Sequence, residues 1–472
     1  MSELIEGGPV PPEEAVALEA HVGPHKGASP LGQFAWALFD GARSPYNALV
    51  NIFVFSAYFS TVVIADPVRG QAVWSYMTAI AALIIAIGAP IFGAVADAGG
   101  RRKPWLIATM ILGIPCMAAI WFATPGMTVG LGLVMAVIIA SNCSFEYSAI
   151  FSNAMLPNVA PNAKRIGFLS GLSFSLGNGS GVILFLFFLL AWSWNPNPLF
   201  GLDAAQHEPE RAVGVLSGLW WLVFGIPLFL FTPDSPSTAR KVPEAIRHGL
   251  TSLKATLSKI GKFKNIVLFL AGRMAFNEGF IVLMLFTGVF AAGVLHWTPT
   301  MLITQGLINS VVAALAGLFA GWLDAKIGSK KSTIAFVAGC LVFNIILVSI
   351  TPTMIFFVDI GTNTSTGGLY PTLPDKVFFV AQNFVAFFVT CGLATARSLM
   401  AKLSPPAMLN EFFGLYALSG TATAFLGPLA IGILTGLFHS QRAGVAVGVV
   451  FFAVGILLML RVKEERAEVE VL

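Results

Sequence analysis

Residues 93–103 read GAVADAGGRRK, a charged hairpin that contains Gly93, Asp97, Gly100, Arg101 and Arg102. The hairpin lies between two apolar stretches, each long enough, at about 20 residues, to cross a bilayer as a helix. Its charges must therefore lie at the interface between membrane and water. Gly93 allows two helix backbones to approach closely, and Asp97 marks the end of the first helix. The basic cluster holds the loop at one membrane face.

The composition of the whole chain indicates the same environment. Of its 472 residues, 56% are hydrophobic and only 11% are charged, and the mean hydropathy is +0.82. A soluble globular protein of this length needs far more charge to cover its surface. The sequence therefore predicts an all-α, polytopic membrane protein that has the lipid bilayer as a partner. The net charge of +4 comes from loops, so it indicates no nucleic-acid partner.

Apolar runs of about 18–25 residues predict twelve transmembrane helices, near residues 44–66, 73–96, 105–123, 129–152, 167–191, 212–232, 265–292, 299–323, 333–350, 377–400, 412–437 and 443–461. Of the lysines and arginines, 20 lie on the face that carries both termini and 4 on the opposite face. Positive loops stay on the cytoplasmic side. We therefore expect both termini in the cytoplasm and the protein in the cytoplasmic (inner) membrane.

The spans form two groups of six. We expect a disordered cytoplasmic tail at 1–32, an N-terminal bundle at 33–232, a basic linker at 233–264, a C-terminal bundle at 265–463 and a cytoplasmic tail at 464–472. In the linker, apolar residues recur at spacings of four and three among lysines, at Ile246, Leu250, Leu253, Leu257 and Ile260. This pattern predicts an amphipathic helix on the anionic inner leaflet. A binding segment for a protein partner is the alternative.

A second copy of the hairpin follows the eighth span. Residues 321–331 read GWLDAKIGSKK, and they repeat the first hairpin with Asp324, Gly328 and Lys330. The spacing from glycine to aspartate is one residue shorter than in the first hairpin, and the spacing from aspartate to the next glycine is one residue longer. The first hairpin matches every fixed position of G-x-x-x-D-x-x-G-R-[RK]. It thereby resembles the loop between the second and third helices of major facilitator superfamily transporters. The resemblance implies two pseudo-symmetric six-helix bundles that rock about a midplane site. It also implies a gate in which Asp97 lies near the start of the eleventh span.

Few charged residues lie inside the spans, where each needs a partner, water or a function. They are Asp40 and Arg43 in the first span, Glu146 in the fourth, Arg273 and Glu278 in the seventh, and Arg397 in the tenth. In the fold that the hairpin resembles, these four spans line the central cavity. We therefore expect substrate binding or coupling at these residues. Asn142 and Asn277 join them, because each lies four residues from Glu146 or Arg273 on the same helical face.

Some of these charges also have structural interpretations. Asp40 and Arg43 are three residues apart and can pair, which would steady the start of the first helix as well as it would serve a cavity. Arg397 lies five residues before Lys402 and could extend its side chain to the interface instead of lining the cavity. Both alternatives remain open at this point.

The deeper charges favour function. A low-dielectric surrounding favours the neutral form of a carboxyl group, so Glu146 and Glu278 suit a proton carrier. Arg273 offers a fork of donors that matches a substrate carboxylate, and its alternative is an ion pair with Glu146 or Asp40 across the bundles. Arg273 and Glu278 are five residues apart, about 140° around a helix, which predicts different partners.

The remaining polar residues carry weaker signals. Amides inside the spans are expected to join helices, with substrate binding as the alternative; they are Asn47, Asn51, Gln305, Asn309, Gln382 and Asn383. Gly427 and Pro428 predict a kink in the eleventh span. No histidine lies in mid-span, and the chain has no nucleophile elbow and no phosphate-binding lysine motif. We therefore expect no metal, no cofactor and no enzymatic activity.

Several segments resemble a narrower group. Residues 36–44 read WALFDGARS and are similar to W-x-L-Y-D-x-A-N-S, with Arg43 in place of Asn. Residues 276–279 read FNEG and are similar to Y-N-D-G, and residues 411–416 and 440–444 follow the C-terminal pattern. These segments resemble the vacuolar amino-acid effluxers linked to autophagy and their bacterial relatives. The resemblance implies the major facilitator fold and export of an amino acid or a similar solute.

The sequence thus predicts a secondary active transporter of a small polar solute, amino-acid-like or anionic, acting by alternating access. We expect a functional monomer that exports its substrate, with protons as possible coupling ions. One alternative is a lipid-handling transporter of the same fold. Another is a non-transporting membrane receptor or assembly protein, which would have no reason to keep carboxylates in the cavity helices.

Overall fold

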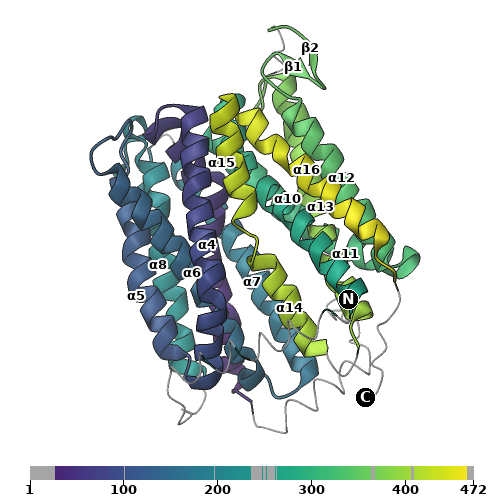
Figure 1. Cartoon of the computed structure of the whole chain (residues 1–472). Coiled ribbons are helices and arrows are strands. Elements are labelled where there is room, and N and C mark those ends of the chain that lie inside the picture. The colour runs from purple at the N-terminus through teal and green to yellow at the C-terminus, as the bar shows by residue number, and fades with distance from the viewer. Residues whose placement is uncertain are drawn as a thin grey trace.

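The computed structural model describes residues 27–99, 101–195, 197–234, 263–362, 367–405 and 409–464, together with positions 247, 251 and 261. The side chains of 94–99, 163–164 and 409–411 are not described. Most of the predicted linker helix therefore lies outside the described residues, as do residues 1–26 of the predicted N-terminal tail and 465–472 of the predicted C-terminal tail. Figure 1 shows a mainly helical molecule in which two helical bundles lie side by side.

Twelve helical spans long and apolar enough to cross a membrane lie within the described residues, which confirms the predicted number. The N-terminal bundle comprises α2 (Pro30–Tyr46), η1 (Asn47–Phe53), α3 (Phe55–Tyr58), η2 (Phe59–Val63), α4 (Pro67–Gly99), α5 (Lys103–Ala119), η3 (Ile120–Phe122), α6 (Leu131–Val159), α7 (Ala163–Phe188), η4 (Leu189–Ser193) and α8 (Glu208–Phe231). Two short turns, η5 (Leu199–Gly201) and η6 (Ala204–Gln206), precede α8.

The C-terminal bundle comprises α10 (Lys264–Val294), α11 (Pro299–Ile327), α12 (Ser329–Val348), α13 (Leu373–Leu403), α14 (Leu409–Thr421), α15 (Leu426–Phe438) and α16 (Gln441–Arg461). A hairpin of two antiparallel strands, β1 (Met354–Ile355) and β2 (Val358–Asp359), joins α12 to α13. We call the end of the molecule that carries this β-hairpin the hairpin face (Figure 1). The charged hairpin of residues 321–331, between α11 and α12, lies at the other end. The opposite end, where α2 begins and α8 ends, is the linker face.

The first span begins earlier than the sequence predicts. We placed its start near residue 44, whereas α2 begins at Pro30, where the Ser29 hydroxyl accepts a hydrogen bond from the Gly32 N–H at 3.1 Å. The added turns bury Trp36 and Phe39 against the bundle, and this burial stabilises helix that the count of apolar residues missed. The span is also irregular, because η1 and η2 are π-helical and flank a break at Val54.

The eleventh span is broken in two, which confirms the predicted kink. α14 ends at Thr421 and α15 begins at Leu426, with residues 422–425 forming turns between them. Pro428 lies in the first turn of α15, where its missing N–H costs little because that group would have no partner within the helix. The break leaves the carbonyl groups of one half-helix and the N–H groups of the other without helical partners.

The two bundles repeat the same contact at the linker face. In the N-terminal bundle, Asp234 accepts hydrogen bonds from the backbone N–H of Arg102, at the start of α5, at 2.9 Å. In the C-terminal bundle, Glu464 accepts one from the N–H of Ser329, at the start of α12, at 2.9 Å. A carboxylate at a helix N-terminus stabilises the helix by about 0.3–1 kcal/mol. The equivalent positions support the duplication that the two hairpins predict.

A second repeated contact lies toward the hairpin face. Arg211 donates to the carbonyl oxygen of Trp121 at 2.7 Å, and Arg442 donates to that of Val348 at 2.8 Å. Each arginine begins the last span of its bundle, and each carbonyl lies at the end of the third span, where a positive charge complements the helix dipole. Each bundle is thus fastened at both faces.

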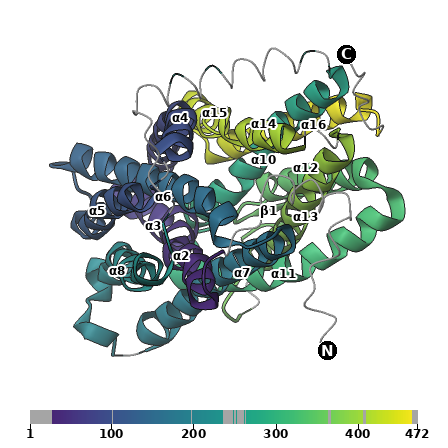
Figure 2. The same cartoon turned by 90° about the horizontal axis from the view of Figure 1, so that it is seen from below.

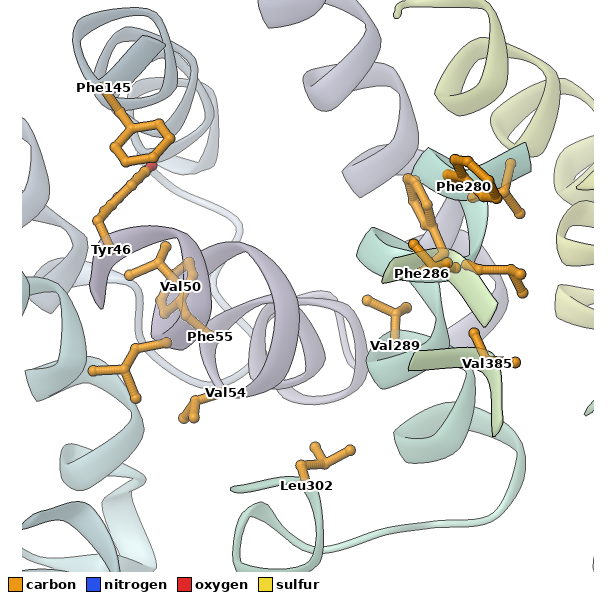
Figure 3. Packing of buried hydrophobic residues seen from close by; sticks show 14 of the residues in the cluster. Tyr46, Val50, Val54, Phe55, Phe145, Phe280, Phe286, Val289, Leu302 and Val385 are labelled. Atoms are coloured by element: carbon orange, nitrogen blue, oxygen red, sulfur yellow. The ribbon is translucent and has the colours of Figure 1, made fainter. Parts of the chain in front are cut away.

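The bundles meet mainly in the half nearer the hairpin face. There α15 packs on α4, while η1 and α3 pack on α10, and Figures 1 and 2 show α15 beside α4. A Cβ atom at Gly288 of α10 would lie only 2.3 Å from the carbonyl oxygen of Ile52, so only glycine allows this approach. The apolar core continues across this contact, from Val54 and Phe55 to Val289 and Leu302 (Figure 3).

Candidate functional site

In the N-terminal bundle, α2 brings two predicted site residues together. The Nη2 atom of Arg43 donates to Oδ1 of Asp40 at 2.6 Å, which confirms the pairing predicted from their spacing. The guanidinium carbon of Arg43 also lies 4.6 Å from the centroid of the Phe145 ring on α6. The pair therefore contacts the fourth span as well as its own helix. This arrangement is compatible both with a structural role at the start of the first span and with a role in the cavity.

Glu146 of α6 lies next to this pair. Its carboxyl group interacts electrostatically with both Arg43 and Asp40. The Glu146 side chain is exposed. One arginine and two carboxylates thus share this part of the N-terminal bundle.

Asn142, one turn from Glu146, is engaged within the bundle. Its Oδ1 accepts a hydrogen bond from Asn51 at 2.7 Å, and its Nδ2 donates to the carbonyl of Ile138 at 3.1 Å. Asn51 also donates to Asn47 at 3.2 Å. These bonds connect the π-helical part of the first span to the fourth span. For Asn47 and Asn51, the structure favours the expected role in joining helices. Asn142, which we expected at a substrate or coupling site, takes part in the same hydrogen bonds.

In the C-terminal bundle, α10 turns Arg273 toward the broken span. The side chain is 7% exposed, and its Nη1 donates to the carbonyl of Tyr416 at 2.8 Å and to the Ser419 hydroxyl at 2.6 Å. Its guanidinium carbon lies 3.7 Å from the centroid of the Tyr416 ring. One turn later, Asn277 donates to the carbonyl of Gly420 at 3.3 Å. Both side chains thereby satisfy groups at the C-terminal end of α14.

The proposed ion pair between Arg273 and Asp40 or Glu146 is not formed in this structure. Asp40 pairs with Arg43 on its own helix, and Arg273 is turned toward α14. From the sequence, we expected a carboxylate as the negative partner of Arg273. In the structure, the carbonyl groups left without helical partners at the break supply the negative charge density.

Glu278 approaches the same break from its other side. The side chain is 1% exposed, and its Oε2 accepts a hydrogen bond from the N–H of Gly427 at 2.8 Å, in the first turn of α15. Its Oε1 is buried and accepts no hydrogen bond of normal geometry from the described residues. The nearby Thr423 hydroxyl, which lies within the break and interacts with this carboxyl group, likewise has no such partner.

The charges on α10 match the two helix ends that they meet. Arg273 lies at the C-terminal end of α14, where the helix dipole is negative, and Glu278 lies at the N-terminal end of α15, where it is positive. The prediction that these residues have different partners is confirmed. Sequence reasoning missed Tyr416, Ser419 and Thr423. The kink at Gly427 was the available signal, since a break inside a span needs polar partners.

Arg397 of α13 is exposed and forms no hydrogen bond or ion pair with another described residue. It lies six residues before the end of α13 at Leu403. That depth, about 9 Å at 1.5 Å per residue, lies within reach of the interface for a long side chain. Both interpretations of Arg397, as an interfacial residue and as a cavity residue, are compatible with this position.

The first hairpin is described only in part. α4 ends at Gly99, close to the predicted helix end, and α5 begins after Arg102, which is 9% exposed, whereas Arg101 is exposed. The side chain of Asp97 and all of Gly100 lie outside the described residues, as does the side chain of Glu411 near the start of α14. The predicted contact between Asp97 and the eleventh span therefore stays a prediction.

The second hairpin is described fully. Asp324 accepts a hydrogen bond from Lys402, at the end of α13, at 3.2 Å. Gly328 has a φ of +89°, which glycine adopts readily at the joint between α11 and α12. Lys330 donates to the carbonyl of Leu460 at 3.1 Å. The copy thus joins four spans, α11, α12, α13 and α16, at the linker face.

Comparison with known proteins places these features in a family. The profile of a protein family described as "Vacuole effluxer Atg22 like" matches residues 63–167 and 161–472. The chain is 24% identical over 434 residues to an "Uncharacterized MFS-type transporter YxiO" of Bacillus subtilis, covering 91% of this chain and 94% of that one. It is also 26% identical over 271 residues to "Autophagy-related protein 22-1" of Aspergillus fumigatus, covering 55% of this chain and 43% of the fungal one.

Solved structures agree on the fold. The chain is similar to a D-xylose–proton symporter, with a TM-score of 0.65 and 14% identity, over 92% of this chain and 99% of that one. It is also similar to a bacterial homologue of the human lysosomal transporter Spinster in an inward-facing, unoccupied conformation. That match has a TM-score of 0.60 and 15% identity, over 98% of this chain and 100% of the other.

Proposed function

This chain belongs to the Atg22-like vacuole effluxer family of major facilitator superfamily transporters, and on that basis we propose that it exports a small amino-acid-like or anionic solute by alternating access. The chain is a multi-pass secondary transporter and not an enzyme. The observation that carries the proposal is the pair of opposite charges that α10 brings to the break in the eleventh span.

Arg273 is the residue that we assign to a carboxylate of the solute. Its Nη1 is occupied by α14, while Nε and Nη2 form no hydrogen bond with another described residue. Two N–H groups of a guanidinium match the two oxygens of a carboxylate. A Cβ at Gly420 would lie 3.0 Å from Nη2, so glycine keeps space beside this part of the fork. Asn277, one turn on, would contact the same solute.

Proton coupling is the second part of the proposal, with Glu278 as the carrier and Glu146 as the other candidate. Glu278 lies at the middle of α10, and its Oε1 is free of hydrogen bonds from the described residues. A buried carboxyl group with one oxygen free of hydrogen bonds can take up a proton on that oxygen. Glu146 is exposed and interacts electrostatically with the ion pair of Asp40 and Arg43.

Orientation follows from the distribution of positive residues. We propose that the linker face is cytoplasmic, since it carries 20 of the 27 lysines and arginines. The bundles meet mainly near the hairpin face. With this orientation, we propose that the interior is reached from the cytoplasm in this state, which is the side from which an exporter loads. We further propose that the monomer is the functional unit, because one chain contains both bundles.

A transport assay in proteoliposomes tests the proposal. Purified protein would be screened against amino acids, organic acids and sugars, with and without a pH gradient. We expect accumulation of a carboxylate-bearing solute that increases when the gradient is applied. The Glu278→Gln variant is the matched control for coupling. Accumulation of sugars alone would contradict the assigned substrate class, and scrambling of labelled lipid without solute uptake would favour the lipid-handling alternative.

A further inference from the structure

A polar cluster joins the two bundles near the hairpin face. The Nε2 atom of Gln71, on α4, donates to the Thr435 hydroxyl of α15 at 2.9 Å and to the carbonyl of Gln441 on α16 at 3.1 Å. The Gln441 side chain donates back to Oε1 of Gln71 at 3.1 Å. Gln71 and Thr435 are fully buried, and Gln441 is 4% exposed. Among the described residues, every hydrogen bond between the bundles runs through Gln71.

Close backbone packing surrounds this cluster. A Cβ at Gly432 of α15 would lie 2.8 Å from the Tyr76 ring of α4, and one at Gly444 of α16 would lie 2.1 Å from the Thr435 hydroxyl. Helices can approach this closely in a membrane only where one of them lacks a side chain. The hairpin-face half of α15 is therefore the part of the C-terminal bundle that is most firmly attached to the N-terminal bundle.

The other end of α15 is attached within its own bundle. There Glu278 accepts the hydrogen bond from Gly427. Residues 422–425 separate this attachment from α14, which α10 holds independently through Arg273 and Asn277. The half-helix α15 thus has one hydrogen bond to Glu278 and one to Gln71, besides its packing on α4 and α16, and a break separates it from α14.

We propose that α15 is the moving latch of a gate at the hairpin face, closed by Gln71, Thr435 and Gln441 and controlled by the charge of Glu278. The proposal rests on the proposed function, because it explains how a proton on Glu278 would drive transport. A charged carboxylate bonds the N-terminus of α15 more strongly than a neutral carboxyl group does. Protonation therefore loosens α15, and the gate can open.

This arrangement meets a requirement of coupled transport. An empty, unprotonated carrier that changed freely between its two states would dissipate the gradient, so that form must stay closed. In the structure, the contact of Glu278 with Gly427 and the Gln71 cluster coexist, as expected for the closed form. Binding of a proton removes the charge that holds the latch.

No other charged group takes over this role. On α10 itself, Arg273 is engaged with α14. α15, η1 and η2 contain no titratable residue, and α3 contributes only Tyr58. On the other elements packed against α10, the charged residues lie near helix ends except for Arg397 of α13, and the titratable groups away from the ends are Tyr76, Cys340, Cys391 and Tyr416. In the described part of the chain, none of these groups interacts electrostatically with Glu278.

Distance measurements between spin labels test the proposal without transport. The four native cysteines, Cys116, Cys143, Cys340 and Cys391, would first be replaced by serine. Labels at Arg69→Cys on α4 and Phe438→Cys on α15 then report the gate, since both side chains are exposed near the hairpin face. We expect one short distance in the unsubstituted protein at high pH and a growing population of longer distances as the pH falls.

The Glu278→Gln variant carries the decisive result. We expect the same mixture of distances at every pH, with the ratio of closed to open forms at high pH reduced about tenfold, or about 1.4 kcal/mol. The Glu278→Asp variant keeps a carboxyl group and should keep a pH response. The Gln71→Leu variant should open the gate even at high pH.

Three outcomes would overturn the inference: no pH response in the unsubstituted protein, an unchanged pH response in Glu278→Gln, or a closed gate in Gln71→Leu. These failures differ from failure of the proposed function. If uptake ignores the pH gradient while the distances still respond, the gate stands and proton-coupled transport fails. If uptake is coupled while the distances do not respond, only the gate fails.

Discussion

Replacing Arg273 by lysine separates substrate binding from packing. The arginine bonds α14 through Nη1 and keeps Nε and Nη2 free of hydrogen bonds to the described residues. A lysine ammonium can replace the contact with the Tyr416 carbonyl, but it cannot place two further N–H groups against both oxygens of a carboxylate. The substitution thus keeps the charge and the contact with α14 while it removes the fork.

The expected loss follows from those contacts. A hydrogen bond to a charged group contributes about 1.5–3 kcal/mol, and lysine forfeits one such bond to the solute. The dissociation constant should therefore rise about 10- to 100-fold, at 1.4 kcal/mol for each factor of ten. The assay is equilibrium binding, to purified protein in detergent, of the solute that proteoliposomes accumulate. The melting temperature is measured in parallel.

Ser419→Ala is the matched control. It removes a hydroxyl that accepts from the same guanidinium at 2.6 Å and leaves the fork intact. We expect a loss of about 1 kcal/mol in stability, as for an ordinary hydrogen bond, with affinity changed by no more than a few fold. Normal affinity in a well-folded Arg273→Lys protein would refute the assignment of Arg273 to the solute. Equal losses of affinity in both variants would show that Arg273 acts through the packing of α14.

Three further predictions concern the gates and the coupling. Glu278→Gln should abolish accumulation driven by a pH gradient and leave exchange of substrate intact, because the binding residues remain; accumulation that still follows the gradient in a proteoliposome assay would exclude Glu278 as the carrier. Asp97→Asn should slow turnover and leave affinity within a few fold, because a gate and not a site would be weakened; an unchanged transport rate would contradict this role. Gly288→Ala should shift the spin-label distances toward the open form. Its Cβ would lie 2.3 Å from the Ile52 carbonyl oxygen when the bundles touch, and such overpacking costs about 1–3 kcal/mol. Distances equal to those of the unsubstituted protein would show that the contact relaxes instead.

The sequence predicts those parts of the structure that depend on the membrane or on local spacing. The number of spans follows from the length of apolar chain that a bilayer requires, and the structure contains twelve of them. The ion pair of Asp40 and Arg43 follows from a spacing of three residues on one helix. The break near Gly427 follows from a glycine and a proline inside an apolar run.

The partners of Arg273 and Glu278 could not be predicted in the same way. Both residues form hydrogen bonds with backbone groups. Every residue has such groups, so the sequence does not show which of them are available as partners. From the sequence, the only candidate partners for Arg273 were therefore carboxylate side chains, such as Asp40. The start of the first span was missed for a related reason, since burial of Trp36 and Phe39 depends on neighbours that are distant in the chain.

The duplication explains which part of the molecule is free to move. At the rims, the bundles repeat the same contacts with different residues, Asp234 in one and Glu464 in the other, so each bundle is fastened at its ends. In the middle, the repeat fails: α7 is continuous over Ala163–Phe188, whereas the corresponding span of the second bundle is split into α14 and α15. In the first span, Asp40 and Arg43 pair with each other. In the seventh span, Arg273 bonds α14 and Glu278 bonds α15. We therefore expect a proton on Glu278 to move α15 without loosening the contacts that fasten each bundle at its ends.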